Sequence, residues 1–471
     1  MILRPRQVKA INDLRAAYRS GYRAPILVAP TGFGKTATSV EMIRSALARG
    51  RSVWFLAHLR EILHATSQLL EREGIRHAWV AAGQLGDRRQ AVQLAMVQTL
   101  VRRLDRYEPP DLLIVDEAHL AVAQTYTKIL EWAPRAHRLF LTATPTRLDG
   151  RGLGEIADCI VPTCSTGDLI AEGLLAPIRY FAPDLPDLSN VRTTAGEYNT
   201  SDLLEAMDRP KLIGSVVEHY RKLASGKPCI AFCVSIAHAQ HVAEQFNAAG
   251  FRAMAVDGAT DDAMRDAALR SLQTGQLDVV ANCALWVAGV DAPAVSCIAL
   301  LAPTKSVTKY LQSVGRGLRT HPEKSELVIL DHAGLVARFG MPTDERDWTL
   351  NGAGRRVRKP GETEEVKIKT CPKCYSTVAA VTTHCYCGHE FVAEGRVLEH
   401  EEGLLTEVDP VAARRSARVQ QGQAQSLEEL ITLGRARGMK RPELWAKYVL
   451  RARHAKQAQK TGAINQGVAH A

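Results

Sequence analysis

The sequence predicts two doubly wound α/β domains in tandem, followed by a small cysteine-rich module and a helical tail. Its 471 residues are too many for one hydrophobic core. Short apolar runs alternate with helical patterns as far as about residue 335, and this alternation occurs twice. Such alternation is typical of parallel sheets whose two faces are covered by helices.

The first domain is expected over residues 1–165. Its strands are predicted at short apolar runs, and a helix follows the first of them: 26–29, 53–57, 112–116 and 139–142, with the helix at 36–48. Residues 166–207 are expected to connect the domains, because they contain Pro177, Pro183 and Pro186 and show little periodicity. The second domain is expected over residues 208–350, with strands at 229–233, 279–283, 297–301 and 327–330 and a helix at 237–249.

The composition of the chain changes after residue 350. Residues 352–365 are rich in Gly, Lys, Arg and Glu and are typical of a linker, and the cysteines that follow define a module over 366–392. Residues 393–471 are expected to form a mobile polar stretch and a basic helical tail. The basic residues of this tail suit either a nucleic-acid-binding face or an ordinary solvated face.

Composition and charge limit the class of protein. The chain has 46% hydrophobic and 23% charged residues, which is ordinary for a globular protein. No apolar run reaches the roughly 18 residues of a membrane helix, and residues 1–10 lack a signal-peptide core. We therefore expect a cytoplasmic protein without a membrane partner. The net charge of +10 is consistent with a polyanionic partner, and it is equally consistent with ordinary surface charge.

A glycine-rich loop between a predicted strand and a predicted helix indicates a phosphate-binding site. Residues 29–36 read Ala-Pro-Thr-Gly-Phe-Gly-Lys-Thr, and glycines let backbone N–H groups turn toward phosphate oxygens. Lys35 is expected to reach the β- and γ-phosphates of ATP, and Thr36 to bind Mg²⁺. The candidate nucleotide-binding residues of this loop are Thr31, Gly32, Gly34, Lys35 and Thr36.

An acidic pair follows another predicted strand. Residues 112–119 read Leu-Leu-Ile-Val-Asp-Glu-Ala-His, so Asp116 stands at the carboxyl end of the strand. We expect Asp116 to hold Mg²⁺, directly or through water, and Glu117 to polarise the attacking water. A helix cap would explain an isolated acidic pair, but the phosphate loop upstream favours the catalytic interpretation.

The segment Asp116-Glu-Ala-His119 resembles the box that defines the DEAD/DEAH group of superfamily 2 helicases. The resemblance implies two RecA-like domains that share one ATP site. It also implies that Gln7, in Leu-Arg-Pro-Arg-Gln, reads the adenine base. Other residues resemble the family's nucleic-acid contacts and coupling positions: His58, Gln98, Thr99, His119, Thr142, Thr144 and Ser235.

Gly289 and Asp291 resemble the motif that links nucleic acid to the nucleotide, so they join the expected cofactor-binding residues. The sequence departs from the family pattern here. Many relatives carry Glu just before this glycine, where this chain has Ala288, and Trp286 stands where smaller aliphatic residues are usual. Trp286 suits a core position better than a base-stacking one.

Residues 312–319, Gln-Ser-Val-Gly-Arg-Gly-Leu-Arg, resemble the last helicase motif. The resemblance implies that Gln312, Arg316 and Arg319 complete the catalytic site from the second domain. A planar cation there would stabilise charge on the transferred phosphoryl group, and an arginine finger is worth about 10³–10⁵ in rate. Arg319 is our first choice for this finger and Arg316 for a second γ-phosphate contact. A basic, solvated helix face is the alternative interpretation.

The closer resemblance is to the type III restriction-subunit branch, particularly to helicases encoded by phages and prophages. Residues 301–306, 331–334 and 347–350 carry it. It implies an ATP-dependent helicase or translocase that acts on DNA, with RNA as an alternative, together with replication or restriction partners. A restriction motor that does not separate strands is a further hypothesis. A clamp that only binds ATP is another, but the presence of Lys35, Asp116, Glu117 and Arg319 argues against it.

Four cysteines lie close together in the sequence and indicate a structural zinc site. Cys371-Pro-Lys-Cys374 is followed by His384-Cys-Tyr-Cys387, and two close ligand pairs suit a tetrahedral zinc ribbon. The expected ligands are Cys371, Cys374, Cys385 and Cys387, with His384 as the alternative to Cys385. A coincidental group of free thiols is the competing interpretation. The six other cysteines lack metal spacing and are expected to be free thiols.

Overall fold

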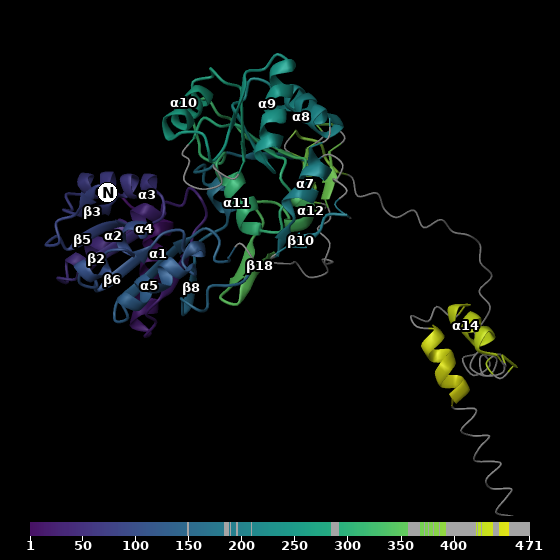
Figure 1. The fold of residues 1–471 in the computed structure, drawn as a ribbon, viewed down its shortest axis with the longest axis horizontal. Coiled ribbons are helices and arrows are strands. Elements are labelled where there is room, and N and C mark those ends of the chain that lie inside the picture. The colour runs from purple at the N-terminus through teal and green to yellow at the C-terminus, as the bar shows by residue number, and fades with distance from the viewer. Residues whose placement is uncertain are drawn as a thin grey trace, which may run out of the picture. The chain divides into compact units, whose positions relative to one another are not determined.

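The computed structural model describes residues 1–147, 150–182, 188, 190–194, 196–208, 210–283, 292–356, 368–371, 373–374, 376–379, 381–385, 387–391, 421, 423–424, 426–436 and 442–451. The chain forms two units, Met1–Val392 and Ala393–Ala471, which we describe separately. The first unit contains two large sheets with their helices, and Figure 1 colours the first domain purple to blue and the second teal to green. The expected tandem α/β architecture is confirmed.

The first sheet has eight strands in the order β4-β3-β5-β2-β6-β7-β1-β8. They are β1 Pro25–Val28, β2 Val53–Ala57, β3 Ala78–Ala81, β4 Gln84–Leu85, β5 Val92–Met96, β6 Leu112–Val115, β7 His137–Thr142 and β8 Cys159–Pro162. Neighbouring strands are parallel except for the antiparallel pair β3 and β4. Strands such as β6 are apolar and wholly buried, because helices cover both faces.

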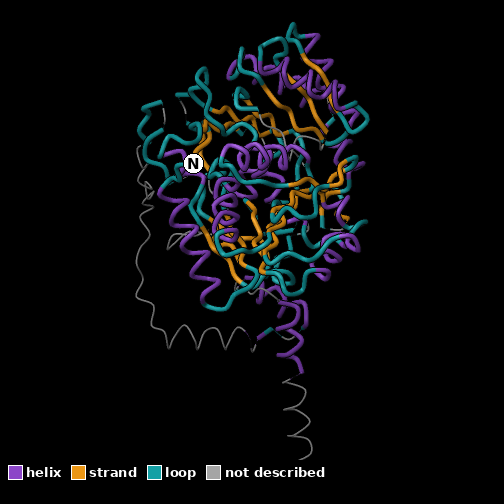
Figure 2. Tube along the Cα trace, turned by 90° about the vertical axis from the view of Figure 1, so that its left-hand side faces the viewer, coloured by secondary structure: helices purple, strands orange, loops and turns teal. Residues whose placement is uncertain are grey.

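Helices pack on the two faces of this sheet, so one strand contributes to two cores. They are α1 Pro5–Arg19, α2 Lys35–Leu47, α3 Arg60–Arg72, α4 Val97–Leu100 and α5 Gln124–Trp132, with short 3₁₀ turns η1 Leu104–Arg106 and η2 Ala118–Leu120. In β1, Leu27 enters one core, while Ile26 and Val28 enter the other. Figure 2 shows the strands lying among the helices.

The second sheet has six parallel strands in the order β13-β14-β12-β15-β16-β9. They are β9 Ile178–Phe181, β12 Cys229–Cys233, β13 Ala253–Val256, β14 Val279–Cys283, β15 Cys297–Leu300 and β16 Leu327–Asp331. β9 lies within the stretch 166–207 that we expected to connect the domains, yet it pairs with β16 along its whole length. Part of that stretch therefore belongs to the second sheet.

The helices after β8 are α6 Thr166–Ala171, α7 Thr200–Met207, α8 Pro210–Leu223, α9 Ile236–Ala248, α10 Asp262–Gln273, α11 Val307–Gly315 and α12 Leu335–Phe339. A small hairpin of β10 Thr193–Thr194 and β11 Glu197–Tyr198 precedes α7. Glu197 fastens this hairpin to the second domain, because its carboxylate accepts hydrogen bonds from Thr304 Oγ1 at 2.5 Å and from the backbone N–H of Lys305 at 2.6 Å.

A second hairpin, of β17 Arg346–Thr349 and β18 Gly352–Arg356, follows the second domain in sequence but contacts the first. The backbone N–H of Gly154 donates to the Leu350 carbonyl at 2.9 Å, and Trp348 and Leu350 pack against the first domain's core. Residues 352–356, which we expected to begin a linker, are a strand of this hairpin. The rest of that expected linker, from residue 357, lies outside the described residues.

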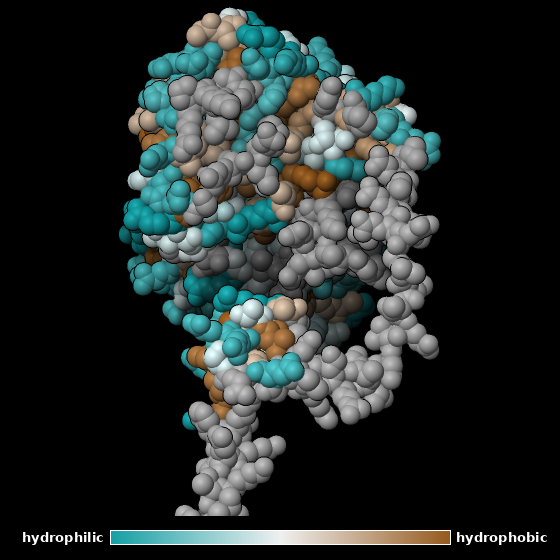
Figure 3. Space-filling view, turned by 90° about the vertical axis from the view of Figure 1, so that its right-hand side faces the viewer, coloured by the Kyte–Doolittle hydropathy of each residue, from teal (hydrophilic) through white to brown (hydrophobic). Residues whose placement is uncertain are grey.

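The cysteine module contains β19 Ile368–Thr370 and β20 Thr377–Ala379. It packs at the end of β9, where the N–H of Ala182 donates to Thr377 Oγ1 at 3.0 Å. In the second unit, α14 spans Leu427–Ala436 and residues 442–451 are also helical. Among the described residues, every helix is too short or too polar to cross a bilayer. Hydrophilic residues cover much of the described surface on the face drawn in Figure 3.

Candidate active site and metal centre

The glycine-rich loop lies at the carboxyl end of β1 and leads into α2. Gly32 and Gly34 have φ angles of +82° and +94°, in the left-handed region that favours glycine. A Cβ on Gly34 would lie 2.3 Å from Gln7 Nε2, so a larger residue would displace both groups. Thr36 lies in the first turn of α2, whose free N–H groups suit an anion. Lys35 Nζ donates to the carbonyl of Ala29 at 3.2 Å.

Gln7 lies beneath this loop and is 3% exposed. Its Nε2 donates to the carbonyl of Phe33 at 3.0 Å, and its Oε1 accepts from the backbone N–H of Arg4 at 2.9 Å. The Arg4 guanidinium in turn donates to the carbonyl of Gly32 at 3.1 Å. The start of α1 is therefore bonded to the loop through two side chains, a feature that the resemblance to adenine-reading glutamines had not predicted.

The acidic pair lies at the carboxyl end of β6, beside the loop. Glu117 has a φ of +51°, the only positive φ among the described non-glycine residues. A residue held in this region costs free energy, and such strain clusters at functional sites. The carboxylate of Asp116 accepts a hydrogen bond from the Glu117 N–H at 3.0 Å, which fixes the two groups relative to each other.

The two carboxyl groups differ in their electrostatic environment. Burial raises the pKa of Asp116 to about 6, and the negative charge of Glu117 acts in the same direction. Burial also acts to raise the pKa of Glu117, whereas contact with His119 acts to lower it. The charges of Lys35 and Arg316 add to this effect, so the pKa of Glu117 falls to about 2. Glu117 is thus fully ionised near neutral pH, whereas Asp116 takes up a proton as the pH falls toward 6.

Side chains from the second domain reach this acidic pair. Gln312, in α11, places Nε2 at 3.3 Å from His119 Nε2, and His119 Nδ1 lies 3.4 Å from Glu117 Oε2. If the amide of Gln312 donates, His119 carries its proton on Nδ1 and faces Glu117 with it. Gly315 lies against the phosphate loop, because a Cβ there would be 2.8 Å from Thr31 Oγ1.

The two predicted arginines follow α11 but differ in position. Arg316 is half-buried, and its charge acts on Glu117 as described above. Arg319 is exposed, and its backbone pairs with Leu175 ahead of β9. The Leu175 side chain covers the phosphate loop, since a Cβ on Gly32 would lie 2.5 Å from it. Both arginines therefore come from a turn that lies near the loop and the acidic pair.

The predicted coupling residues fall into two groups. Thr142 and Thr144 are fully buried, and Thr142 Oγ1 donates to the carbonyl of Thr144 at 3.0 Å. Thr99 and His58 are half-buried. The exposed Gln98 donates to the carbonyl of His58 at 3.4 Å, and burial lowers the pKa of the His58 imidazole.

Ser235 lies in the second domain, where its hydroxyl caps α9 by accepting from the N–H of His238 at 3.1 Å. Gly289 and Asp291, together with Ala288 and Trp286, lie outside the described residues.

Two contacts near the site were not predicted from the sequence. Thr146 Oγ1 and Thr308 Oγ1 form a buried hydrogen bond of 3.1 Å between the two domains. Lys324 Nζ donates to the carbonyls of Val295 and Gly317, and so joins the segment that precedes β15 to the arginine turn. No motif marks these residues, and a lone lysine or threonine in a polar segment has no sequence signal that distinguishes it.

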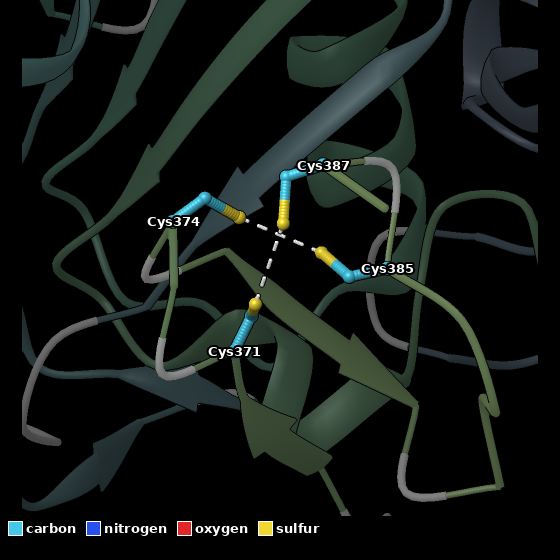
Figure 4. A group of neighbouring side chains, drawn as sticks. All are labelled: Cys371, Cys374, Cys385 and Cys387. Carbon is cyan, nitrogen blue, oxygen red and sulfur yellow. Dashed lines mark hydrogen bonds between the residues drawn. The ribbon is translucent and has the colours of Figure 1, made fainter. Parts of the chain in front are cut away.

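The four cysteines converge, as Figure 4 shows. Their Sγ atoms all lie within 4.8 Å of one another, with Cys371 and Cys387 at 3.6 Å and Cys374 and Cys385 at 3.5 Å. Tetrahedral zinc with four thiolates requires S–S separations of about 3.8 Å, so the group fits this ion. The imidazole of His384 is outside the group, with its side chain 67% exposed and facing Glu390. The structure thus favours Cys385 over His384 as the fourth ligand.

Comparisons with known proteins agree with this geometry. Residues 1–147 match the family described as type III restriction enzyme, res subunit, and residues 211–321 match the helicase conserved C-terminal domain. A 51.5 kDa protein of a Lactococcus phage (isolate 7-9) is 30% identical over 385 residues, covering 82% of this chain and 81% of that protein.

Longer relatives match over part of their length. A Saccharomyces cerevisiae protein named as an ATP-dependent helicase, IRC3, is 30% identical over 71% of this chain and 52% of its own length. The type I restriction enzyme EcoAI endonuclease subunit of Escherichia coli is 27% identical over 72% of this chain. This chain spans only 47% of that subunit and about half of the yeast protein.

Solved structures support the fold. A fragment named as an HsdR subunit of a type I restriction enzyme from Vibrio vulnificus YJ016 matches with a TM-score of 0.59 and 20% identity, covering 72% of this chain and 66% of that one. The ATP-dependent type ISP restriction-modification enzyme LlaBIII, bound to DNA, matches with a TM-score of 0.53 and 15% identity, covering 70% of this chain and 28% of that one. At these identities the likeness concerns the fold alone.

Proposed function

This chain belongs to the superfamily 2 helicases, in the branch of the type III restriction subunit, and we propose that it is an ATP-driven motor that moves along DNA. The observation that carries the proposal is the chain of contacts from Gln312 through His119 to Glu117. It joins the second domain to the acidic pair beside the phosphate loop. A change in the domain arrangement would therefore alter the group that we expect to activate water.

We assign roles within the site from this arrangement. The loop backbone at Thr31, Gly32 and Gly34 would cradle the phosphates of ATP, and Lys35 would compensate their charge. Thr36 and Asp116 would hold Mg²⁺, which neutralises charge between the β- and γ-phosphates when bound. The adenine-reading role of Gln7 rests on resemblance, and its present bonds to the loop suit a residue that links base recognition to loop conformation.

Glu117 is suited to orient the attacking water. Its pKa of about 2 leaves it ionised at neutral pH, so it can accept a hydrogen bond from water. Arg316 and Arg319 would stabilise the negative charge that develops on the transferred phosphoryl group. Because they come from the second domain, hydrolysis would require the two domains to lie together. The DEAD/DEAH assignment of the acidic box is part of this proposal.

Movement along a strand would follow from the shared site. ATP would favour the state in which the arginines contact phosphate, and hydrolysis would remove those contacts. Thr142 and Thr144, together with Gly289 and Asp291, would pass this change to residues that hold the strand. His58, Gln98, Thr99 and Ser235 are the strand contacts that we propose on the resemblance. DNA is the proposed track, since the restriction relatives act in DNA restriction, and RNA is the alternative.

A second candidate function is translocation along duplex DNA without strand separation, as the motor of a restriction complex. The similarity to the EcoAI endonuclease subunit favours it. No nuclease constellation is evident in the tail of the sequence, residues 393–471, so a partner protein would supply any cleavage.

One set of assays tests both candidates. ATP turnover should rise when DNA is added, and the apparent DNA affinity should fall steeply with salt, because backbone phosphates dominate such contacts. Strand displacement from 3′-tailed and 5′-tailed DNA and RNA duplexes reports unwinding, and displacement of a triplex-forming oligonucleotide reports translocation. Lys35→Ala should abolish all three activities in a folded protein. Turnover that is indifferent to nucleic acid at every salt concentration would contradict the motor function.

A further inference from the structure

A cavity of about 920 Å³ lies at the amino-terminal edge of the first sheet, away from the strand ends that carry the ATP site. Asp111 and Leu112, at the start of β6, and His137, at the start of β7, line it. The carboxyl-terminal parts of α1 and α2 form further walls. None of the motifs in the sequence falls on this edge, so the proposed motor function leaves the cavity unexplained.

Arginines surround this cavity, which we call the arginine-rimmed cavity. Its lining includes five of them: Arg15, Arg19, Arg49, Arg51 and Arg135. Among the lining residues, all of which the structure describes, Asp111 carries the one negative charge, and Arg51 pairs with it at 2.9 Å. The surplus of positive charge is therefore large.

The rim arginines differ in how far neighbouring groups satisfy them. Arg15 donates to Ser45 Oγ at 2.7 Å and lies 3.6 Å from Glu41. Arg19 and Arg135 are exposed, and within the part of the chain that the structure describes their guanidinium groups form no hydrogen bond or ion pair. The two side chains are thus available to an anionic ligand.

The neighbouring His137 responds to this positive charge. Burial lowers the pKa of its imidazole, and the charges of Arg23 and Arg51 lower it further, while Asp111 acts in the opposite direction. The cations therefore outweigh the carboxylate at this position. Of these two cations, Arg51 lines the cavity, whereas Arg23 lies outside its lining.

The floor of the arginine-rimmed cavity is apolar. Met42, Ala46, Leu112 and Trp132 contribute to it, and Pro109, Pro110 and Pro134 form adjoining wall. Cations around an apolar floor suit a ligand that carries both negative charge and apolar groups. The rim cations are all arginine, whose planar guanidinium binds carboxylates in a bidentate geometry.

We propose that the arginine-rimmed cavity binds an acidic segment of a protein partner, with the segment's carboxylates on the rim and its apolar side chains on the floor. The concavity is half-open and is bounded by α1, α2 and the segments that precede β6 and β7. It fits a short segment better than a nucleic-acid strand, which follows a continuous basic groove with open aromatic faces. The aromatic rings here are engaged edge-to-face, Tyr18 with His137 at 5.6 Å and Trp132 with Trp54 at 5.5 Å. The cavity also lies at the opposite edge of the sheet from His58 and Gln98, the proposed nucleic-acid contacts, which follow the carboxyl ends of β2 and β5.

The test uses the full chain and a fluorescein-labelled peptide in which glutamates flank a leucine and a tryptophan. Fluorescence anisotropy gives the dissociation constant for the wild type and for the double variant Arg19→Glu with Arg135→Glu. The matched control is Arg72→Glu with Arg76→Glu, because these arginines are also exposed on the first domain and the change in net charge is equal. Polyglutamate and a single-stranded oligothymidylate serve as competing probes.

We expect the rim variant to weaken binding of the mixed peptide about tenfold or more, because it removes charge-assisted hydrogen bonds. The control variant should bind nearly as the wild type does, and DNA-stimulated ATP turnover should be unchanged in the rim variant. Equal weakening in both double variants would overturn the proposal, as would polyglutamate binding as tightly as the mixed peptide. Selective loss of oligothymidylate binding in the rim variant would assign the cavity to nucleic acid instead.

Discussion

Glu117 combines three unusual properties that bear on how a single residue can respond to a distant domain. It has a left-handed backbone, a strongly lowered pKa, and contact with a histidine that is itself bonded to the second domain. Removing Gln312 from His119 would free the imidazole to turn, and so change the environment of Glu117. The side chain of His119 is therefore all that separates Gln312, which makes the domain contact, from Glu117, the proposed water-activating group.

The arginine turn gives the first mutational prediction. Arg316→Ala and Arg319→Ala should each lower kcat for ATP by about 10³ while changing KM little, because the lost interaction acts mainly on charge in the transition state. Steady-state ATPase assays measure this, with Arg270→Ala as a control, since Arg270 is an exposed arginine of the same domain. A large rise in KM with an unchanged kcat would show that the substituted arginine is not the finger.

Lys324 gives a prediction about pH. Burial lowers the pKa of its amine from the ordinary 10.5 to about 7, and the charge of Lys227 adds to the shift. From about pH 7 to about pH 10 the unfolded chain therefore binds more protons at this group than the folded protein, so its contribution to stability rises with pH. The melting temperature of the wild type minus that of Lys324→Met should therefore rise over this interval. The exposed Lys222→Met is the control for the loss of one lysine charge, and parallel curves for the wild type and Lys324→Met would contradict the burial argument.

Secondary-structure elements differ in how far the sequence predicted them. Strands such as β2 and β12 are apolar runs of five residues buried throughout, so the pattern indicated them directly. β9 was missed because it is short and lies between prolines, and its pairing with β16 involves residues far apart in the sequence. β18 was missed because its Gly- and Arg-rich composition is typical of a linker, whereas contact with the first domain stabilises it.

The candidate site likewise contains some contacts that the sequence predicted and others that it did not. The phosphate loop and the acidic pair are local motifs, so each was identified from a few consecutive residues. The hydrogen bond between Thr146 and Thr308 and the bonds of Lys324 depend on how distant segments pack, and the sequence carries no local sign of them. The four clustered cysteines were predicted from spacing, with Cys385 preferred to His384, and the geometry agrees with that preference.

The cysteine module should bind about one zinc ion per chain, measured by elemental analysis of freshly purified, reduced protein. Cys371→Ser should lose the metal and unfold the module locally, since metal supplies much of the folding free energy of so small a module. His384→Ala is the matched control and should keep the ion, because this imidazole lies outside the thiol group. Basal ATP turnover should survive in both variants. Metal-free wild-type protein, or metal loss in His384→Ala alone, would refute the assignment.

Besides the packing of Gly315 and Leu175 on the phosphate loop, three further contacts join the two domains of the motor in the part of the chain that the structure describes. The first is the polar chain through Gln312 and His119, and the second is the buried hydrogen bond between Thr146 and Thr308. The third is the hairpin of β17 and β18, which leaves the second domain and packs on the core of the first. Only the hairpin lies away from the ATP motifs, so it could limit how far the domains separate without taking part in hydrolysis.

Gly152 allows a test of that role. A Cβ at this position would lie 1.9 Å from the Leu350 carbonyl, so Gly152→Val must push the hairpin away from the first domain. Overpacking of this kind costs about 1–3 kcal/mol, which suffices to detach a short hairpin while both domain cores remain folded. We expect faster proteolysis of the segment around residues 340–356 and a smaller ratio of DNA-stimulated to basal ATP turnover. Gly258→Val is the control, because a Cβ there meets open space and its φ lies outside the left-handed region. If Gly152→Val detached the hairpin, as proteolysis would report, and the stimulation ratio stayed at the wild-type value, the hairpin would have no part in coupling the domains.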